Sequence, residues 1–161
     1  MNFKEALSRV EKSKEFDNFK KQHPKAYLCA GFFVLDFETG DSTQQLDYQL
    51  EEKIATFSVN NEVKIKIQET TKQKKLDKLI KPEIEIDKLR KIADKELEKK
   101  KIVSKLNKII AILQMYESKC IWNLTCMLES FAMLRVHVDA ISGEVLKSEK
   151  ASLFDFVKKV K

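Results

Sequence analysis

The sequence contains few residues of the types that bind metals or act as nucleophiles: three cysteines and two histidines. Cys120 and Cys126 are six positions apart with no second ligand pair nearby, whereas structural zinc sites use ligands at short, regular spacing. Like Cys29, they lie in apolar, strand-like runs, where a thiol behaves as a small hydrophobic side chain. The spacing therefore predicts reduced, buried cysteines and no metal site.

Catalytic arrangements are equally sparse. His23 precedes a proline at the end of an expected helix, and His137 has an outward position between two inward-facing valines. Cys126 and His137 can be imagined as a nucleophile and base, but nothing in the sequence lowers the pKa of that thiol. Glu51 and Glu52 flank a turn, and three glycines are too few for a phosphate-binding loop. We expect a protein that is not an enzyme, with no catalytic residues and no cofactor.

Apolar residues on both faces of two expected strands point instead to a binding surface. Phe32 and Phe33 are consecutive, and consecutive strand residues point to opposite faces. The second strand likewise places Trp122 on one face and Met127 on the other. Strands that are apolar on both faces need cover on both, from helices on each side or from a second copy of the protein. These four residues are therefore candidates for binding a protein partner or for forming a homodimer.

The positive charge of the chain is concentrated in one segment. The formal net charge is +6, and residues 72–108 contain 14 Lys or Arg against 7 Asp or Glu, which accounts for the whole excess. Clustered lysines bind phosphates by releasing counterions, so nucleic acid is the alternative partner. The interleaved acids are equally typical of a solvated helix face. The candidate nucleic-acid-binding residues are Lys74, Lys75, Lys78, Lys99, Lys100 and Lys101.

The elements that must position these residues follow from the periodicity of the sequence. Residues 2–22 are expected to form one helix, which ends before Pro24 because proline cannot continue the hydrogen-bond ladder. Alternating apolar residues then predict strands and turns over residues 25–69, with turns at 39–41 and 60–61. The first half of the chain therefore reads as a helix followed by antiparallel strands.

The second half begins with a helical pattern. Residues 82–116 are helical by propensity, and their apolar stripe rotates near residues 98–101, which predicts a break or bend there. Three strands follow between residues 119 and 150. A short closing helix is expected from Ser152, which would be its N-cap.

The order of these elements predicts an internal repeat. Residues 16–19 align with 110–113, and after a gap residues 57–60 align with 136–139. Each half then reads as helix, long strand, return strand, turn and strand, although two unrelated α+β segments would give a similar pattern. The predicted fold class is α+β, with two cystatin-like helix-plus-antiparallel-hairpin halves and a curved antiparallel sheet packed by helices. The expected parts of this one compact domain are residues 1–70, a basic helical connector at 71–101, and residues 102–161.

The stretch "VHVDAISGEVL", Val136 to Leu146, resembles the closing hairpin of PepSY-type domains, which are small cystatin-like α+β modules. The resemblance lies mainly within residues 119–149. In the turn, Gly143 would supply a positive φ, and Asp139 or Ser142 would cap it. The resemblance implies an amphipathic helix on a curved sheet and a non-catalytic role in inhibiting or regulating a partner enzyme. PepSY-type domains are usually exported or membrane-attached, and this sequence shows neither an export signal nor an anchor.

Length and composition set the broad class. The chain has 161 residues, of which 43% are hydrophobic, enough for one domain with a core. No apolar run approaches the roughly 20 residues that cross a bilayer, and the charged N-terminus lacks the apolar region of a signal peptide. We therefore expect a cytoplasmic, non-enzymatic protein-binding or assembly module without a membrane span.

Overall fold

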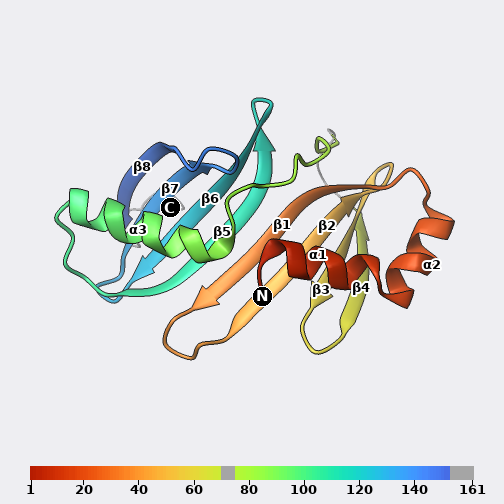
Figure 1. Cartoon of the computed structure of the whole chain (residues 1–161), viewed down its shortest axis with the longest axis horizontal. Helices are drawn as coiled ribbons and strands as arrows, with labels where there is room; N and C mark the ends of the chain where they lie inside the picture. The colour runs from red at the N-terminus through yellow and green to blue at the C-terminus, as the bar shows by residue number, and fades with distance from the viewer. Residues whose placement is uncertain (70–74, 153–161) are drawn as a thin grey trace.

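The structure is a computed structural model that describes residues 1–69 and 75–152 (Figure 1). Three helices lie in these residues: α1 (Phe3–Glu11), α2 (Lys14–Gln22) and α3 (Ile86–Lys99). The strands of the described residues are β1 (Tyr27–Asp36), β2 (Ser42–Gln49), β3 (Lys53–Val59), β4 (Val63–Glu69), β5 (Leu106–Tyr116), β6 (Lys119–Leu128), β7 (Ala132–Asp139) and β8 (Val145–Ser152). Lys74 and the predicted closing helix beyond Ser152 lie outside the described residues.

All eight strands form one antiparallel sheet, in the order β4-β3-β2-β1-β5-β6-β7-β8. Each half of the chain contributes a meander of four strands. The meanders join where β1 pairs with β5, from Ala30 opposite Gln114 to Asp36 opposite Lys108. The predicted fold of two cystatin-like helix-plus-hairpin halves is therefore wrong. Because β1 and β5 are apolar on both faces, they pair with each other at the centre of one continuous sheet.

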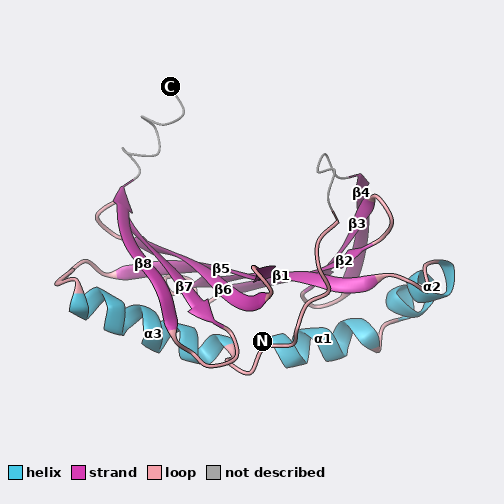
Figure 2. Ribbon diagram, turned by 90° about the horizontal axis from the view of Figure 1, so that it is seen from above, coloured by secondary structure: helices cyan, strands magenta, loops and turns pink. Residues whose placement is uncertain are grey.

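The described helices lie on one face of that sheet. In Figure 2, α1 and α3 lie below the sheet, and the far ends of β4 and β8 rise above the central strands on the opposite side. The ring of Phe3 in α1 lies 6.5 Å from that of Phe33 in β1, and Phe16 of α2 lies 5.7 Å from Phe57 of β3. Leu89 of α3 belongs to the same connected core. One layer of helices thus covers both meanders.

The N-terminal helix predicted over residues 2–22 is in fact two helices. Ser13 separates them: its hydroxyl donates a hydrogen bond to the Val10 carbonyl at 2.6 Å and accepts one from the Phe16 amide at 3.1 Å. This arrangement caps the start of α2. The break leaves Val10 of α1 and Phe19 of α2 both buried, which one straight helix with a single apolar stripe would not achieve.

The helix predicted over residues 82–116 is also wrong in its second part. α3 ends at Lys99, inside the segment where a break was expected, and residues 106–116 form strand β5. Ile109, Ile110 and Ile112 are β-branched and favour strands. Burial in β5 alternates with a period of two from Ile109 onwards.

The predicted internal repeat therefore aligned a helix with a strand. Residues 16–19 lie in α2, whereas residues 110–113 lie in β5. In the structure, β1 and β5 correspond instead: β1 follows α1 and α2, β5 follows α3, and each begins a four-strand meander.

Two turns of the sheet share a six-residue pattern: "DFETGD" joins β1 to β2, and "DAISGE" joins β7 to β8. In each turn the side chain of the first residue, Asp36 or Asp139, accepts hydrogen bonds from the backbone amides two and three positions later, at 2.8 to 3.2 Å. The fifth residue is a glycine with φ of +76° or +82°, a region that glycine enters without strain. The turn at Asp139 therefore has a structural role, and the same type of turn occurs at Asp36.

The segment between β4 and α3 is fastened to the sheet. The Leu79 amide donates to the Leu28 carbonyl at 2.9 Å, and the Ile84 amide donates to the Ala140 carbonyl at 2.8 Å. The indole N–H of Trp122 donates to the Ile84 carbonyl, also at 2.8 Å. These bonds fix the point at which α3 begins.

Glu85, the residue before α3, also connects the two halves. Its carboxylate accepts hydrogen bonds from the amides of Phe3 at 2.9 Å and Lys4 at 3.3 Å. The start of α1 is thus capped by a side chain from the second half of the chain.

Candidate functional site: the helix-free face of the sheet

One face of the sheet carries none of the helices that the structure describes (Figure 2). We call it the helix-free face and define it by the partly exposed alternate residues of β1, β5, β6 and β7. It comprises Phe32 and Val34 of β1, Ile110 and Ile112 of β5, Asn123, Thr125 and Met127 of β6, and Arg135 and His137 of β7. All of these side chains are partly exposed.

The centre of the helix-free face is apolar. Phe32 lies opposite Ile112, and Val34 lies opposite Ile110, in the β1–β5 pair that joins the two meanders. Cross-strand neighbours on one face are close enough to pack together, so these four side chains form a continuous apolar centre. The contribution of β5 was missed by sequence reasoning, which placed Ile110 and Ile112 in a helix. Their β-branched side chains were the signal that could have identified it.

A charged margin lies on β7 and β8. Arg135 is opposite Glu149 and His137 is opposite Lys147, and the ammonium of Lys147 lies 3.4 Å from the Glu149 carboxylate. Burial and then the neighbouring Lys147 lower the pKa of His137, and together they outweigh the opposite effect of Glu149. His137 therefore favours the neutral form. Its position on the helix-free face, between inward-facing valines, confirms the prediction from alternation.

The fold does not bring Cys126 close to His137, as a nucleophile and its base would require. Cys126 is buried on the helix-covered face, opposite to that of His137. Burial raises the pKa of Cys29, Cys120 and Cys126 to about 12 each, so their thiols stay protonated near neutral pH. Among residues 1–69 and 75–152, no three His, Cys, Asp or Glu side chains gather into a metal site.

The four predicted partner-binding residues divide between the two faces. Phe32 and Met127 lie on the helix-free face, as described above. Phe33 and Trp122 are 1% and 0% exposed beneath the helices, so they cannot contact a partner in this fold. Alternation correctly separated Phe32 from Phe33, but it could not indicate which of the two faces the helices cover.

The predicted nucleic-acid-binding lysines do not form one surface in the described part of the chain. Lys75 and Lys78 precede the fastened segment before α3, whereas Lys99 is the last residue of that helix and Lys100 and Lys101 follow it. In Figure 1 the chain before the fastened segment and the C-terminal end of α3 are well separated. Lys99 is also 3.3 Å from the Glu96 carboxylate. This separation removes the geometric basis for a single phosphate-binding patch made of these residues.

Comparison with known proteins gives one match of fold. No protein-family model and no curated protein matches the chain, so the resemblance to PepSY-type domains stays a prediction. A solved structure, described as a "putative lipoprotein" from Clostridium difficile 630, is similar with a TM-score of 0.58 and 14% identity. The match covers 85% of this chain and 90% of that one, and at this identity it concerns the fold alone.

That similarity corrects one prediction. The expected cytoplasmic location is contradicted, because the similar fold belongs to a chain described as a lipoprotein, a class that attached lipid holds at a membrane. Within the described residues, none of the helices has the length and apolar character required to span a membrane.

Proposed function

We propose that the chain is a non-enzymatic module that binds a protein partner on the helix-free face of its sheet. The observation that carries the proposal is the apolar centre formed by Phe32, Val34, Ile110 and Ile112, which no described helix covers. Apolar surface that is grouped on one face and ringed by polar groups is typical of a protein-binding site.

The chemistry of the face favours a protein over other ligands. Phe32 is the one aromatic residue among the side chains that define the helix-free face, whereas proteins that bind single-stranded nucleic acids stack successive bases on several aromatics. The protonated thiols and the isolated His137 likewise support a role without catalysis.

The net charge of the chain favours a different protein over a second copy. At a formal charge of +6, two copies repel each other, and a large net charge keeps a protein monomeric. The partner that fits best has an apolar patch on a surface of negative net charge.

Site-specific crosslinking in the native host tests this function. A photoreactive amino acid at Phe32 or at Ile112 should capture the same protein, and one at Val103, which is 98% exposed outside the face, should not. The captured protein is then purified and its affinity measured for the wild type and for the variant Phe32→Ser, Ile112→Ser. We expect the double variant to bind about tenfold or more weakly, because two central apolar contacts are lost.

Four results would count against the proposal. Equal capture from Val103, or no capture from either position on the face, would place the interaction elsewhere. An unchanged affinity of the double variant, with an unchanged melting temperature as the control for folding, would have the same meaning. Capture of the chain by itself would replace the partner with a homodimer.

A further inference from the structure

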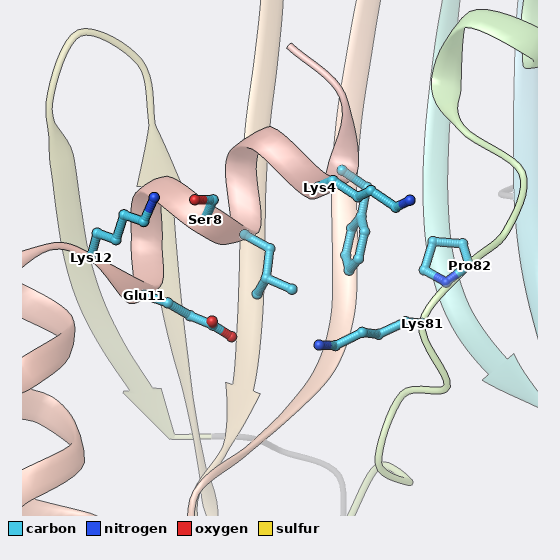
Figure 3. A pocket seen from close by; sticks show the side chains of 8 residues that line it. Lys4, Ser8, Glu11, Lys12, Lys81 and Pro82 are labelled. Atoms are coloured by element: carbon cyan, nitrogen blue, oxygen red, sulfur yellow. The ribbon is translucent and has the colours of Figure 1, made fainter.

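A second surface with binding character lies in the helix layer. A hollow of about 320 Å³ opens between α1 and residues 81–82 of the segment that leads to α3 (Figure 3). Phe3, Leu7 and Pro82 supply its apolar lining, and all three are buried. Because α1 covers the sheet on the other side from the helix-free face, the hollow is independent of the surface proposed above.

The rim of the hollow is mainly basic. Lys4 of α1, Lys12 directly after that helix and Lys81 opposite them surround it, together with Ser8 and the single acid Glu11. In Figure 3 the side chains of Lys81 and Glu11 point toward each other, while Lys4 and Lys12 lie toward opposite ends of the hollow. Within the described residues, Lys4 and Lys12 take part in no ion pair. The hollow thus combines an apolar floor with two unmatched positive charges.

The spacing of these two lysines selects the kind of ligand. Lys4 and Lys12, the C-cap residue of α1, are eight positions apart, so their Cα atoms are separated by about 12 Å along the helix axis. Their side chains lie toward opposite ends of the hollow (Figure 3), so a ligand that contacts both lysines needs one acidic group at each end. In an extended peptide, side chains four positions apart lie on one face at about 13 Å, and the side chain midway between them points the same way.

We propose that the hollow binds an extended acidic segment of a protein partner, with the pattern acid-x-apolar-x-acid. The two acids contact Lys4 and Lys12, and the apolar side chain between them enters the hollow against Phe3, Leu7 and Pro82. A free small carboxylate would match one lysine only and would leave the other end of the hollow unused.

A synthetic peptide tests the assignment. Fluorescein-labelled Glu-Ser-Leu-Ser-Glu, blocked at both ends, is titrated with the full chain at low salt and followed by fluorescence anisotropy. We expect saturable binding that the double variant Lys4→Glu, Lys12→Glu weakens by about tenfold, because both charge contacts become repulsive. The matched control Lys64→Glu, Lys66→Glu changes the net charge by the same amount on β4. Residues 64 and 66 pair with Ser58 and Thr56, which alternate with the buried residues of β3 and so lie on the opposite face of the sheet from the hollow. This control should bind within about twofold of the wild type.

A second peptide, Glu-Ser-Ser-Ser-Glu, tests the apolar anchor and should bind several-fold more weakly than the leucine peptide. The proposal fails if the two peptides bind equally, if both double variants lose affinity equally, or if the leucine peptide shows no saturable binding. Thermal melts of both variants establish that they are folded. If Lys4→Glu, Lys12→Glu melts early, the pair Lys4→Gln, Lys12→Gln replaces it in the same assay. None of these outcomes depends on the helix-free face, so this test and the crosslinking test can fail separately.

Discussion

Asp36 and Asp139 show at the scale of single residues how local chemistry determines the turns. Hydrogen bonds from the amides of Thr39 and Ser142 hold the pKa of each carboxyl below its ordinary value. A carboxyl whose pKa is lowered by folding stabilises the fold fully at pH values above its unfolded pKa of about 3.9. That contribution is lost as the pH falls through the lower folded value.

Replacing Asp139 should therefore have a pH-dependent effect. We expect Asp139→Ala to lower the melting temperature by about 2 to 4 °C at pH 7, a size typical for loss of one capping side chain in a chain of this length. The difference from the wild type should shrink between pH 4 and pH 2, where Asp139 of the wild type becomes protonated. Thermal melts across this range measure it, with Glu144→Ala as the control in the same turn. A difference that stays constant at all pH values would contradict the assignment.

At this scale the sequence was informative wherever the determinants are neighbours in the chain. The turn around Gly143 and the outward position of His137 depend on residues within a few positions, and both were predicted. The burial of Phe33 and Trp122 was not, because strands that are apolar on both faces give no indication of which face the helices cover. Half of the candidate partner-binding residues were misplaced for that reason.

At the scale of elements, α1 depends on a residue far away in sequence. Asn2 caps its first turn through the Glu5 amide at 2.9 Å, and Glu85 accepts from the amides of Phe3 and Lys4. These acceptors satisfy amide groups that have no partner inside the helix, and the carboxylate also complements the positive end of the helix dipole.

Removing this cap should destabilise the whole chain. We expect Glu85→Ala to lower the free energy of unfolding by about 1 kcal/mol, and Glu85→Gln to lower it less, because the amide keeps one acceptor oxygen. Urea denaturation measures both, and Glu83→Ala, an exposed acid in the same segment, is the control. Equal stability of the Glu85→Ala and Glu83→Ala variants would show that the cap contributes nothing.

The elements that were mispredicted are those for which intrinsic propensity and tertiary contacts disagree. Residues 106–116 contain Leu, Ala, Gln and Met, which favour helices, together with three isoleucines, which favour strands. Pairing on both sides, with β1 and with β6, decides in favour of the strand. The sequence of residues 106–116 alone does not reveal these pairing strands.

At the scale of the whole molecule, the two meanders share one core. The connected cluster runs from Phe3 and Phe57 in the first half to Leu89 and Val136 in the second, and the β1–β5 pair makes the sheet continuous. The joining strands are about 80 positions apart in sequence, so no local pattern could reveal that they pair. That is why the predicted halves were hairpin units and not parts of one sheet.

A shared core predicts that the halves unfold together. Trp122, in the second half, is the single tryptophan and is fully buried, so its fluorescence reports unfolding of β6. Cys29, in the first half, has a pKa raised to about 12 by burial and should react with a thiol reagent only once β1 unfolds. With Cys120 and Cys126 replaced by Ala, we expect the two signals to give the same urea midpoint. Midpoints that differ clearly would show two separately stable halves.

The sheet consists of one four-strand meander from each half, joined by the β1–β5 pair, and this arrangement allows two chains to exchange halves at high protein concentration. All contacts of the β1–β5 pair, and the Glu85 cap on α1, join the first half to the second across one connecting segment. Two molecules that traded their C-terminal halves would recreate each of these bonds between chains instead of within one. Refolding at high protein concentration can thus yield a domain-swapped dimer, in which the β1–β5 pair and the Glu85 cap form between two chains.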